Sequence, residues 1–245
     1  MKKWILFDCM ETLIDMTELP LPADYARWAY EGSEAQRLWT GFDEFYTDYM
    51  AACAEIEKEL PLFREYEMKE RYARVLSAKT KDDQLDELVK NMDDVFWKKY
   101  SGKCYANDSV LEAVDALSKN HPMGVVSNFK IRSGVRSILE NAGLLGYFEF
   151  TVNSCEIGWK KPHVNIYRAA KELAGVDYGS IVFIGDDYGN DYVKPKALGC
   201  KTVLYDPSGA HPEALPRISD FRELLKFDIW EEGKDSHEQE KRQRK

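Results

Sequence analysis

The chain has 245 residues, of which 44% are hydrophobic, 31% charged and 13% aromatic, so it can bury a full core. Its formal net charge of −9 argues against general affinity for nucleic acids but is compatible with a basic pocket for an anionic substrate. No apolar run approaches the ~20 residues of a membrane span, and residues 1–3 lead directly into a short apolar stretch rather than a signal segment. We therefore expect a cytoplasmic protein with a small anionic substrate, no nucleic-acid or membrane partner, and a monomeric or homodimeric state.

The cysteines also favour a cytoplasmic location. There are five of them, an odd number, and they are scattered without a CxxC pair. This pattern favours reduced thiols and indicates neither a disulfide framework nor a zinc site.

The first predicted element is a buried strand over the apolar residues 4–7, which ends at Asp8; Thr12 follows four residues later. Ligands of open α/β sheets lie at the carboxyl ends of the strands, where this aspartate would be. An aspartate there can attack a phosphorus or carbon centre and hold the product as an ester. An aspartate after a strand is also a common turn residue or helix cap, so this motif depends on later stretches for its meaning.

Residues 17–103 are predicted to be helical. Apolar residues recur every three or four positions over 42–60, a stripe that stops before Pro61, and again over 85–96. The block is also rich in aromatic residues, for which helix packing is a better explanation than substrate contact. A helical block of this length after a first strand indicates an inserted subdomain.

From Asp108 onward the pattern alternates between helices and strands. The expected strands cover residues 123–126, 148–152, 181–184 and 201–205, and the expected helices cover 110–117, 131–139 and 164–173. Repeated β-α-β units predict an α/β fold with a doubly wound parallel sheet. The predicted core is then 1–16 with 104–230, and the charged segment 231–245 is predicted to be disordered.

Four polar groups follow strand ends and would meet at one edge of a parallel sheet. They are Asp8 with Thr12, Ser127 with Asn128, Lys161, and Asp186 with Asp187 and Asp191. Each group could instead have a purely structural role. For example, Lys161 before Pro162 could begin a helix, and the paired aspartates could cap one. Four such coincidences in one order nevertheless favour a shared site.

The residue types suggest a role for each group. Asp8 would be the nucleophile, and Asp186 with Asp187 or Asp191 would supply oxygen ligands for Mg²⁺. Lys161 would neutralise charge on the nucleophile and on the transferred group, to which Ser127 and Thr12 would donate hydrogen bonds.

These motifs resemble those of the haloacid dehalogenase-like hydrolase superfamily. Residues 8–12, 127–128, 158–163 and 185–191 match its first to fourth motifs in order. The resemblance implies a Rossmann-like core, a helical cap over residues 17–103, and Lys161 rather than Lys160 as the site lysine. It also implies that the backbone carbonyl of Met10 contacts Mg²⁺, and it includes Asn128 in the catalytic set.

One position departs from the phosphatases of that family. They carry a second aspartate two residues after the nucleophile as general acid, but here that residue is Met10, whose thioether cannot transfer a proton. Loss of a general acid typically costs ~10²–10⁴ in rate. Family dehalogenases lack this acid too, but they typically carry tyrosine there and need no metal. Phosphonate-cleaving members have a small residue there together with a cap lysine.

The leading hypothesis is a Mg²⁺-dependent hydrolase of a small phosphorylated metabolite, such as an acyl phosphate or phosphoanhydride, whose leaving group needs no proton. The alternatives are a metal-independent 2-haloacid dehalogenase and a member that binds without turnover. Glu11 is a conceivable substitute acid, although its position should aim it elsewhere. Candidate cap contacts to the substrate, among which the spacing does not choose, are Arg27, Arg37, Trp39 and Lys58.

Overall fold

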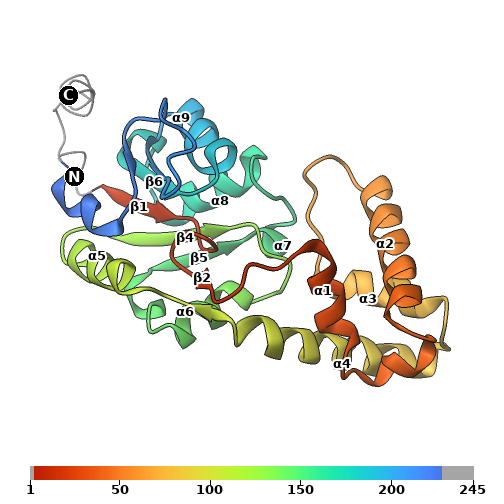
Figure 1. Ribbon diagram of the computed structural model, residues 1–245. Helices are drawn as coiled ribbons and strands as arrows, with labels where there is room; N and C mark the ends of the chain where they lie inside the picture. The colour runs from red at the N-terminus through yellow and green to blue at the C-terminus, as the bar shows by residue number, and fades with distance from the viewer. Residues whose placement is uncertain (1–2, 228–245) are drawn as a thin grey trace.

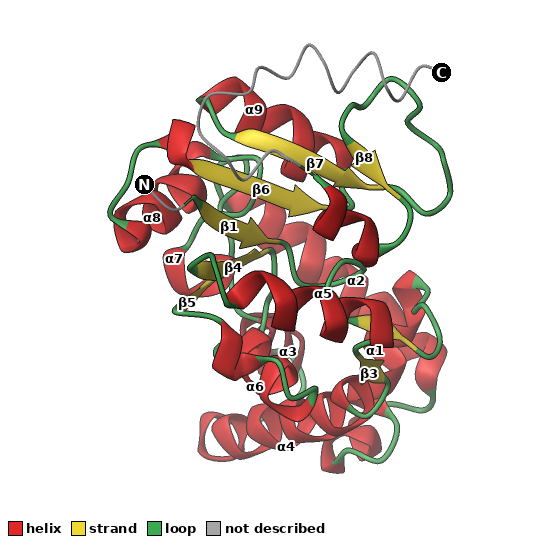
Figure 2. Cartoon of the chain, turned by 90° about the vertical axis from the view of Figure 1, so that its left-hand side faces the viewer, coloured by secondary structure: helices red, strands yellow, loops and turns green. Residues whose placement is uncertain are grey.

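The computed structural model describes residues 3–227, and at their centre lies a six-stranded sheet of order β5-β4-β1-β6-β7-β8. Every neighbouring pair of strands in this sheet is parallel. Figure 2 shows the strands in this order with helices on both faces. The strands are β1 (Trp4–Phe7), β4 (Met123–Ser127), β5 (Phe150–Asn153), β6 (Ile181–Gly185), β7 (Lys201–Tyr205) and β8 (Arg217–Ile218). The predicted doubly wound α/β fold is confirmed.

The two faces of the sheet are covered by different helices because successive side chains of a strand point to opposite faces. The helices of the core are α5 (Asp108–Ser118), α6 (Gly134–Asn141), α7 (Ser154–Ile157), α8 (Val164–Ala174) and α9 (Lys194–Leu198). Ile5 and Phe7 of β1 pack in the apolar cluster that contains residues of α5 and α6, whereas Leu6 packs in the cluster that contains residues of α8.

The structure corrects several boundaries. The strand predicted over 148–152 is β5, which begins two residues later, and the sheet continues past β7 into β8. A strand of two residues is too short to produce an alternating pattern, so β8 could not be predicted from the sequence. The segment predicted to be disordered, 231–245, lies outside the described residues.

The helical insert contains α1 (Pro22–Tyr30), α2 (Phe42–Glu59), α3 (Met68–Ser77) and α4 (Asp82–Ser101). Figure 1 shows these helices together on one side of the sheet domain, and we refer to residues 17–103 as the cap. The chain leaves and re-enters the core through an antiparallel pair of two-residue strands, β2 (Asp15–Met16) and β3 (Cys104–Tyr105). Neither β2 nor β3 was predicted from the sequence, because a strand of two residues is too short to show an alternating pattern.

The aromatic residues of the cap pack against one another. Trp28 lies beside Tyr100, with ring centroids 6.2 Å apart, and Trp39 meets Phe45 edge to face at 5.0 Å. Each such pair adds roughly 0.5–1.5 kcal/mol beyond the buried area. No helix in residues 3–227 is both long enough and apolar enough to cross a membrane.

Candidate active site

The carboxyl end of β1 carries Asp8, which is 7% exposed and whose backbone N–H donates to Ile184 O at 2.8 Å. The loop that follows turns back at once, because the N–H groups of Leu13 and Ile14 both donate to Cys9 O at 2.9 Å. Glu11 adopts a left-handed conformation in this turn, with φ of 59°. The turn brings Thr12 back toward the neighbouring strand β6.

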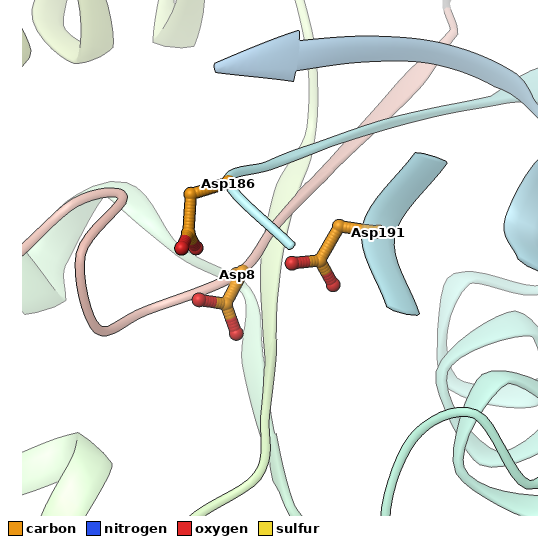
Figure 3. A group of neighbouring side chains, drawn as sticks. All are labelled: Asp8, Asp186 and Asp191. Atoms are coloured by element: carbon orange, nitrogen blue, oxygen red, sulfur yellow. The ribbon is translucent and has the colours of Figure 1, made fainter. Parts of the chain in front are cut away.

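Three carboxylates converge next to this turn. One oxygen from each of Asp8, Asp186 and Asp191 lies within 4.8 Å of the others. Figure 3 shows the three side chains pointing toward one another from separate segments of the chain. Asp186 follows β6, and Asp191 lies in the single-turn π-helix 188–193. Asp191 approaches β6 closely at Gly185, where a Cβ atom would lie 2.5 Å from the Asp191 carboxyl carbon.

Lys161 joins two of these carboxylates. Its Nζ donates to Asp8 Oδ1 at 2.5 Å and to Asp191 Oδ1 at 2.7 Å, and its side chain is 3% exposed. Burial alone would lower the pKa of Lys161, but the charges of Asp191 and Asp8 outweigh burial and raise it. Lys161 therefore stays protonated. Burial raises the pKa of Asp191 well above its usual value. With all three carboxylates ionised, the cluster and its ammonium carry a formal charge of −2.

Asn128 positions this lysine through its main chain. The Asn128 Nδ2 donates to Lys161 O at 3.1 Å, and Lys161 N donates to Asn128 Oδ1 at 2.6 Å. The amide thus holds both backbone groups of the lysine, and it links the loop after β4 to the loop before α8. In this structure Asn128 is a positioning residue for Lys161.

Thr12 is hydrogen-bonded to Asp186. Its hydroxyl donates to Asp186 Oδ1 at 2.9 Å and accepts from Asp186 N at 3.1 Å. The predicted hydrogen bond from Thr12 to the transferred group stays a prediction, and it would require the hydroxyl hydrogen to leave Asp186 Oδ1. Burial and the charge of Asp8 raise the pKa of Asp186 to about 6, despite the hydrogen bond from Thr12.

Asp187 lies outside the carboxylate cluster, although it was predicted as a possible ligand. Its Oδ1 accepts from Asn190 N at 2.8 Å, and its Oδ2 accepts from Asn190 Nδ2 at 2.9 Å. Asp187 is thus the N-cap of the π-helix, which is the plain alternative for this pair of aspartates. Asp191, four residues further along the chain, belongs to the carboxylate cluster instead.

Two further predicted residues lie next to the cluster. Ser127 is the last residue of β4, 1% exposed and adjacent to Asn128, so it lies at the same sheet edge as Asp8. Met10 lines a cavity that also contacts Glu11 and Asn128. A hydrogen bond from Ser127 to the substrate and a metal contact from the Met10 carbonyl stay predictions.

The donor set fits a divalent metal ion. Carboxylate oxygens are the ligands that Mg²⁺ prefers, and a site with two uncompensated negative charges matches a divalent cation. Burial, followed by the charge of Asp8, raises the pKa of Asp186, and a cation bound here would favour its ionised form. Asp8, Asp186 and Asp191 are the described residues that would hold the ion.

A cavity of about 380 Å³ lies between the core and the cap. Met10, Glu11 and the segment 128–131 line its core side, and the cap side includes Tyr25 and Arg71. The four cap residues considered from the sequence, Arg27, Arg37, Trp39 and Lys58, are not among those that line it. Arg71 was not singled out because helical spacing does not tell which charged side chain turns inward.

The cap is also fastened to the core at a second place, which the sequence did not indicate. Glu65, before α3, is 6% exposed; it pairs with Lys130, and its Oε2 accepts from Ser154 Oγ at 3.0 Å. Backbone hydrogen bonds continue this contact, since Glu65 N donates to Gly158 O at 3.1 Å and Lys160 N donates to Phe63 O at 3.0 Å. The cap therefore contacts the same loop that carries Lys161.

The structure thus combines a parallel α/β sheet, a nucleophile candidate with a lysine and clustered carboxylates at the carboxyl edge of that sheet, and an inserted helical cap. The model of the haloacid dehalogenase-like hydrolases matches residues 2–193, and the chain belongs to this family of hydrolases. The chain is 35% identical over 125 residues to the haloacid dehalogenase-like hydrolase domain-containing protein 3 of Danio rerio. That match covers 49% of this chain and 48% of the relative, so the chain spans about half the length of this curated relative.

Two broader matches cover most of the chain. The ribulose-1,5-bisphosphate 5-phosphatase of Halopiger xanaduensis is 24% identical over 208 residues, which is 83% of this chain and 84% of that protein. The crystal structure of a 2-haloacid dehalogenase from Pseudomonas syringae pv. Tomato superposes with a TM-score of 0.76 at 22% identity. It covers 92% of this chain and 97% of that one, and at this identity the likeness concerns the fold.

Proposed function

We propose that this hydrolase is a Mg²⁺-dependent phosphatase that forms an aspartyl phosphate on Asp8 and releases a leaving group that needs no proton. The observation that carries the proposal is the convergence of Asp8, Asp186 and Asp191 within 4.8 Å beside Lys161. Such a cluster serves phosphoryl transfer, in which charge on the reacting oxygens must be neutralised. The similarity to a named phosphatase over 83% of the chain supports the same class.

The proposed reaction proceeds in two displacements. A carboxylate oxygen of Asp8 attacks phosphorus, the bond to the leaving-group oxygen breaks, and that oxygen departs with the electron pair. Water then attacks the phosphorus of the aspartyl phosphate, the bond between phosphorus and Asp8 breaks, Asp8 leaves as a carboxylate, and both hydrogens of the water end on inorganic phosphate, released as H₂PO₄⁻. A bound Mg²⁺ supplies neutralisation of charge on the phosphoryl oxygens, and Lys161 supplies it on Asp8.

Met10 determines which substrates suit this site. No proton donor stands at its position, so carboxylates and phosphates are better leaving groups than alcohols, whose pKa is much higher. We therefore propose acyl phosphates or phosphoanhydrides of small metabolites as the substrate class.

The test measures phosphate release from acetyl phosphate, phenyl phosphate and an alkyl phosphate, with Mg²⁺ or with EDTA. We expect metal-dependent release that falls in the order acyl, aryl, alkyl and that disappears in Asp8→Asn. Met10→Asp should raise the alkyl and aryl rates more than the acyl rate, by up to ~10²–10⁴, because it restores a proton donor.

The possible failures of this test have different meanings. Absence of release from all three substrates would contradict the proposal, and halide release from 2-haloacids without metal would then establish the dehalogenase alternative. If neither phosphate nor halide is released, a role in binding without turnover takes the place of catalysis. If the wild type releases phosphate from all three substrates at similar rates, another acid such as Glu11 would be assigned the proton transfer to the leaving group.

A further inference from the structure

Arg71 of α3 differs from the other arginines of residues 3–227. It is half-buried, yet it forms no ion pair with a described carboxylate. The remaining arginines of this part of the chain either are exposed or pair with an acidic side chain, as Arg217 does with Asp206 at 3.2 Å. Because burial of a charge is costly unless a counter-charge or hydrogen bonds compensate it, Arg71 has unused capacity to bind an anion.

Two tyrosines hold the guanidinium of Arg71 in place. Its Nε donates to Tyr66 Oη at 2.7 Å, and its Nη1 donates to Tyr49 Oη at 3.1 Å. Nη2 takes part in no hydrogen bond with the described residues, so the planar fork keeps N–H donors for another partner. The orientation is therefore fixed before a ligand arrives, which limits the entropic cost of binding.

Arg71 is one of the residues that line the cavity between the cap and the core. Apolar and aromatic side chains form much of the remaining wall, among them Tyr25, Phe96 and Phe129. Lys130 also lines the cavity, but its charge is already compensated by Glu65. One uncompensated positive charge in an apolar wall matches one negative charge on a ligand, which favours a carboxylate over a dianionic phosphate.

The charged residues that line the cavity also favour one orientation of a bound ligand. Glu11 lines the core side, in the turn after Asp8, and would repel a carboxylate there. Asn128, which holds Lys161, lines the same side, so the reacting end of a substrate would lie near these residues. A carboxylate on the opposite end would then meet Arg71.

We infer that the substrate carries a carboxylate, separated from its reacting group by an apolar body, and that Arg71 binds this carboxylate in the cap. The inference rests on the proposed phosphatase function for the identity of the reacting group. A cavity of about 380 Å³ lies within the range of small-molecule sites and accommodates a body of the size of a benzene ring. Arg71 thus determines which substrate is chosen rather than how phosphorus reacts.

The test compares two substrates that differ by one carboxylate, 4-nitrophenyl phosphate and 3-carboxy-4-nitrophenyl phosphate. We expect the wild type to prefer the carboxylated substrate in kcat/KM, and Arg71→Met to lose about 10- to 100-fold on that substrate and much less on the other. Arg71→Lys should restore part of the preference, since it keeps a charge but loses the planar fork. Arg74→Met, which removes an arginine from the same helix, is the matched control and should retain the preference.

A binding experiment separates this inference from the proposed function. Calorimetric titration with 3-phenylpropanoate and with 3-phenylpropanamide needs no hydrolysis, and we expect the wild type to bind the acid at least tenfold more tightly than the amide. Arg71→Met should lose this difference. If neither nitrophenyl substrate is hydrolysed but the acid is still preferred through Arg71, the phosphatase proposal fails and the carboxylate subsite stands. No preference in the wild type, or a preference that survives in a folded Arg71→Met or Arg71→Lys protein without reduction, overturns the subsite.

Discussion

The carboxyl edge of the sheet and the cavity under the cap are assembled in different ways. At the sheet edge Asp8 and Asp186 each follow a strand, and the parallel pairing of β1 with β6 places them side by side. In the cavity the lining residues come from helices α1, α3 and α4, from the segment that joins β1 to α1, and from the loop after β4. Strand pairing therefore determines the first region, whereas helix packing determines which side chains of the cap turn inward.

The two regions also differ in charge. The sheet edge concentrates three carboxylates and one lysine in a buried volume, while the cavity is largely apolar and has one uncompensated cation among the described residues. We therefore expect substitutions at the sheet edge to affect every substrate, and substitutions in the cap to alter the choice among substrates.

The largest expected effect is that of Lys161→Met. The substitution removes the cation between Asp8 and Asp191 and leaves buried carboxylates without their partner. We expect kcat to fall by ~10³ or more for every substrate. Loss of one partner from a buried pair typically costs about 3–5 kcal/mol of unfolding free energy, and bound Mg²⁺ should recover part of it.

Steady-state kinetics and urea unfolding, each with and without Mg²⁺, measure these effects. Lys160→Met is the control, because Lys160 precedes Lys161 in the same loop but is absent from the carboxylate cluster. Equal losses in both variants would mean that the loop as a whole, rather than the ammonium of Lys161, supports the reaction.

The second prediction separates two aspartates four positions apart. Asp191→Asn removes a ligand candidate and a partner of Lys161, so we expect the Kd for Mg²⁺ to rise by about 10- to 100-fold and the rate to fall with it. Asp187→Ala removes an N-cap and should cost about 1 kcal/mol of unfolding free energy with little change in metal affinity. Titration calorimetry with Mg²⁺ distinguishes the two. A comparable loss of affinity in Asp187→Ala would place Asp187 in the metal site.

Asp187 and Asp191 show how far the site could be predicted from the sequence alone. A buried strand followed by Asp186, Asp187 and Asp191 indicated a metal site at the sheet edge, but strand periodicity ends at Gly185. Beyond that point the directions of the side chains depend on the π-helix, which has no recognised pattern in a single sequence. The sequence therefore predicted the cluster but could not separate a ligand candidate from a cap.

The fold and the family could be predicted because the strands of the core are long enough to show their pattern and because the motifs occur in order. Those predictions are confirmed. The cap could be predicted as helical from its apolar spacing, but not the inward direction of Arg71 or the burial of Glu65. Both depend on contacts between segments far apart in the chain, such as the hydrogen bond from Ser154 to Glu65.

The smallest expected effect on catalysis is at the second contact between cap and core, that of Glu65. Glu65→Gln keeps an acceptor for Ser154 Oγ but removes the negative charge beside Lys130, whose pKa burial already lowers. We expect a loss of roughly 1–3 kcal/mol of unfolding free energy and a higher KM with a smaller change in kcat, because the contact of the cap with the core becomes less favourable. The matched control is Glu67→Gln, which removes a pair with Arg132, a side chain that is 61% exposed, and should cost ~1 kcal/mol or less. If both variants lose the same stability and KM is unchanged in Glu65→Gln, the backbone hydrogen bonds of Phe63, Glu65 and Met68 alone hold the cap against the core.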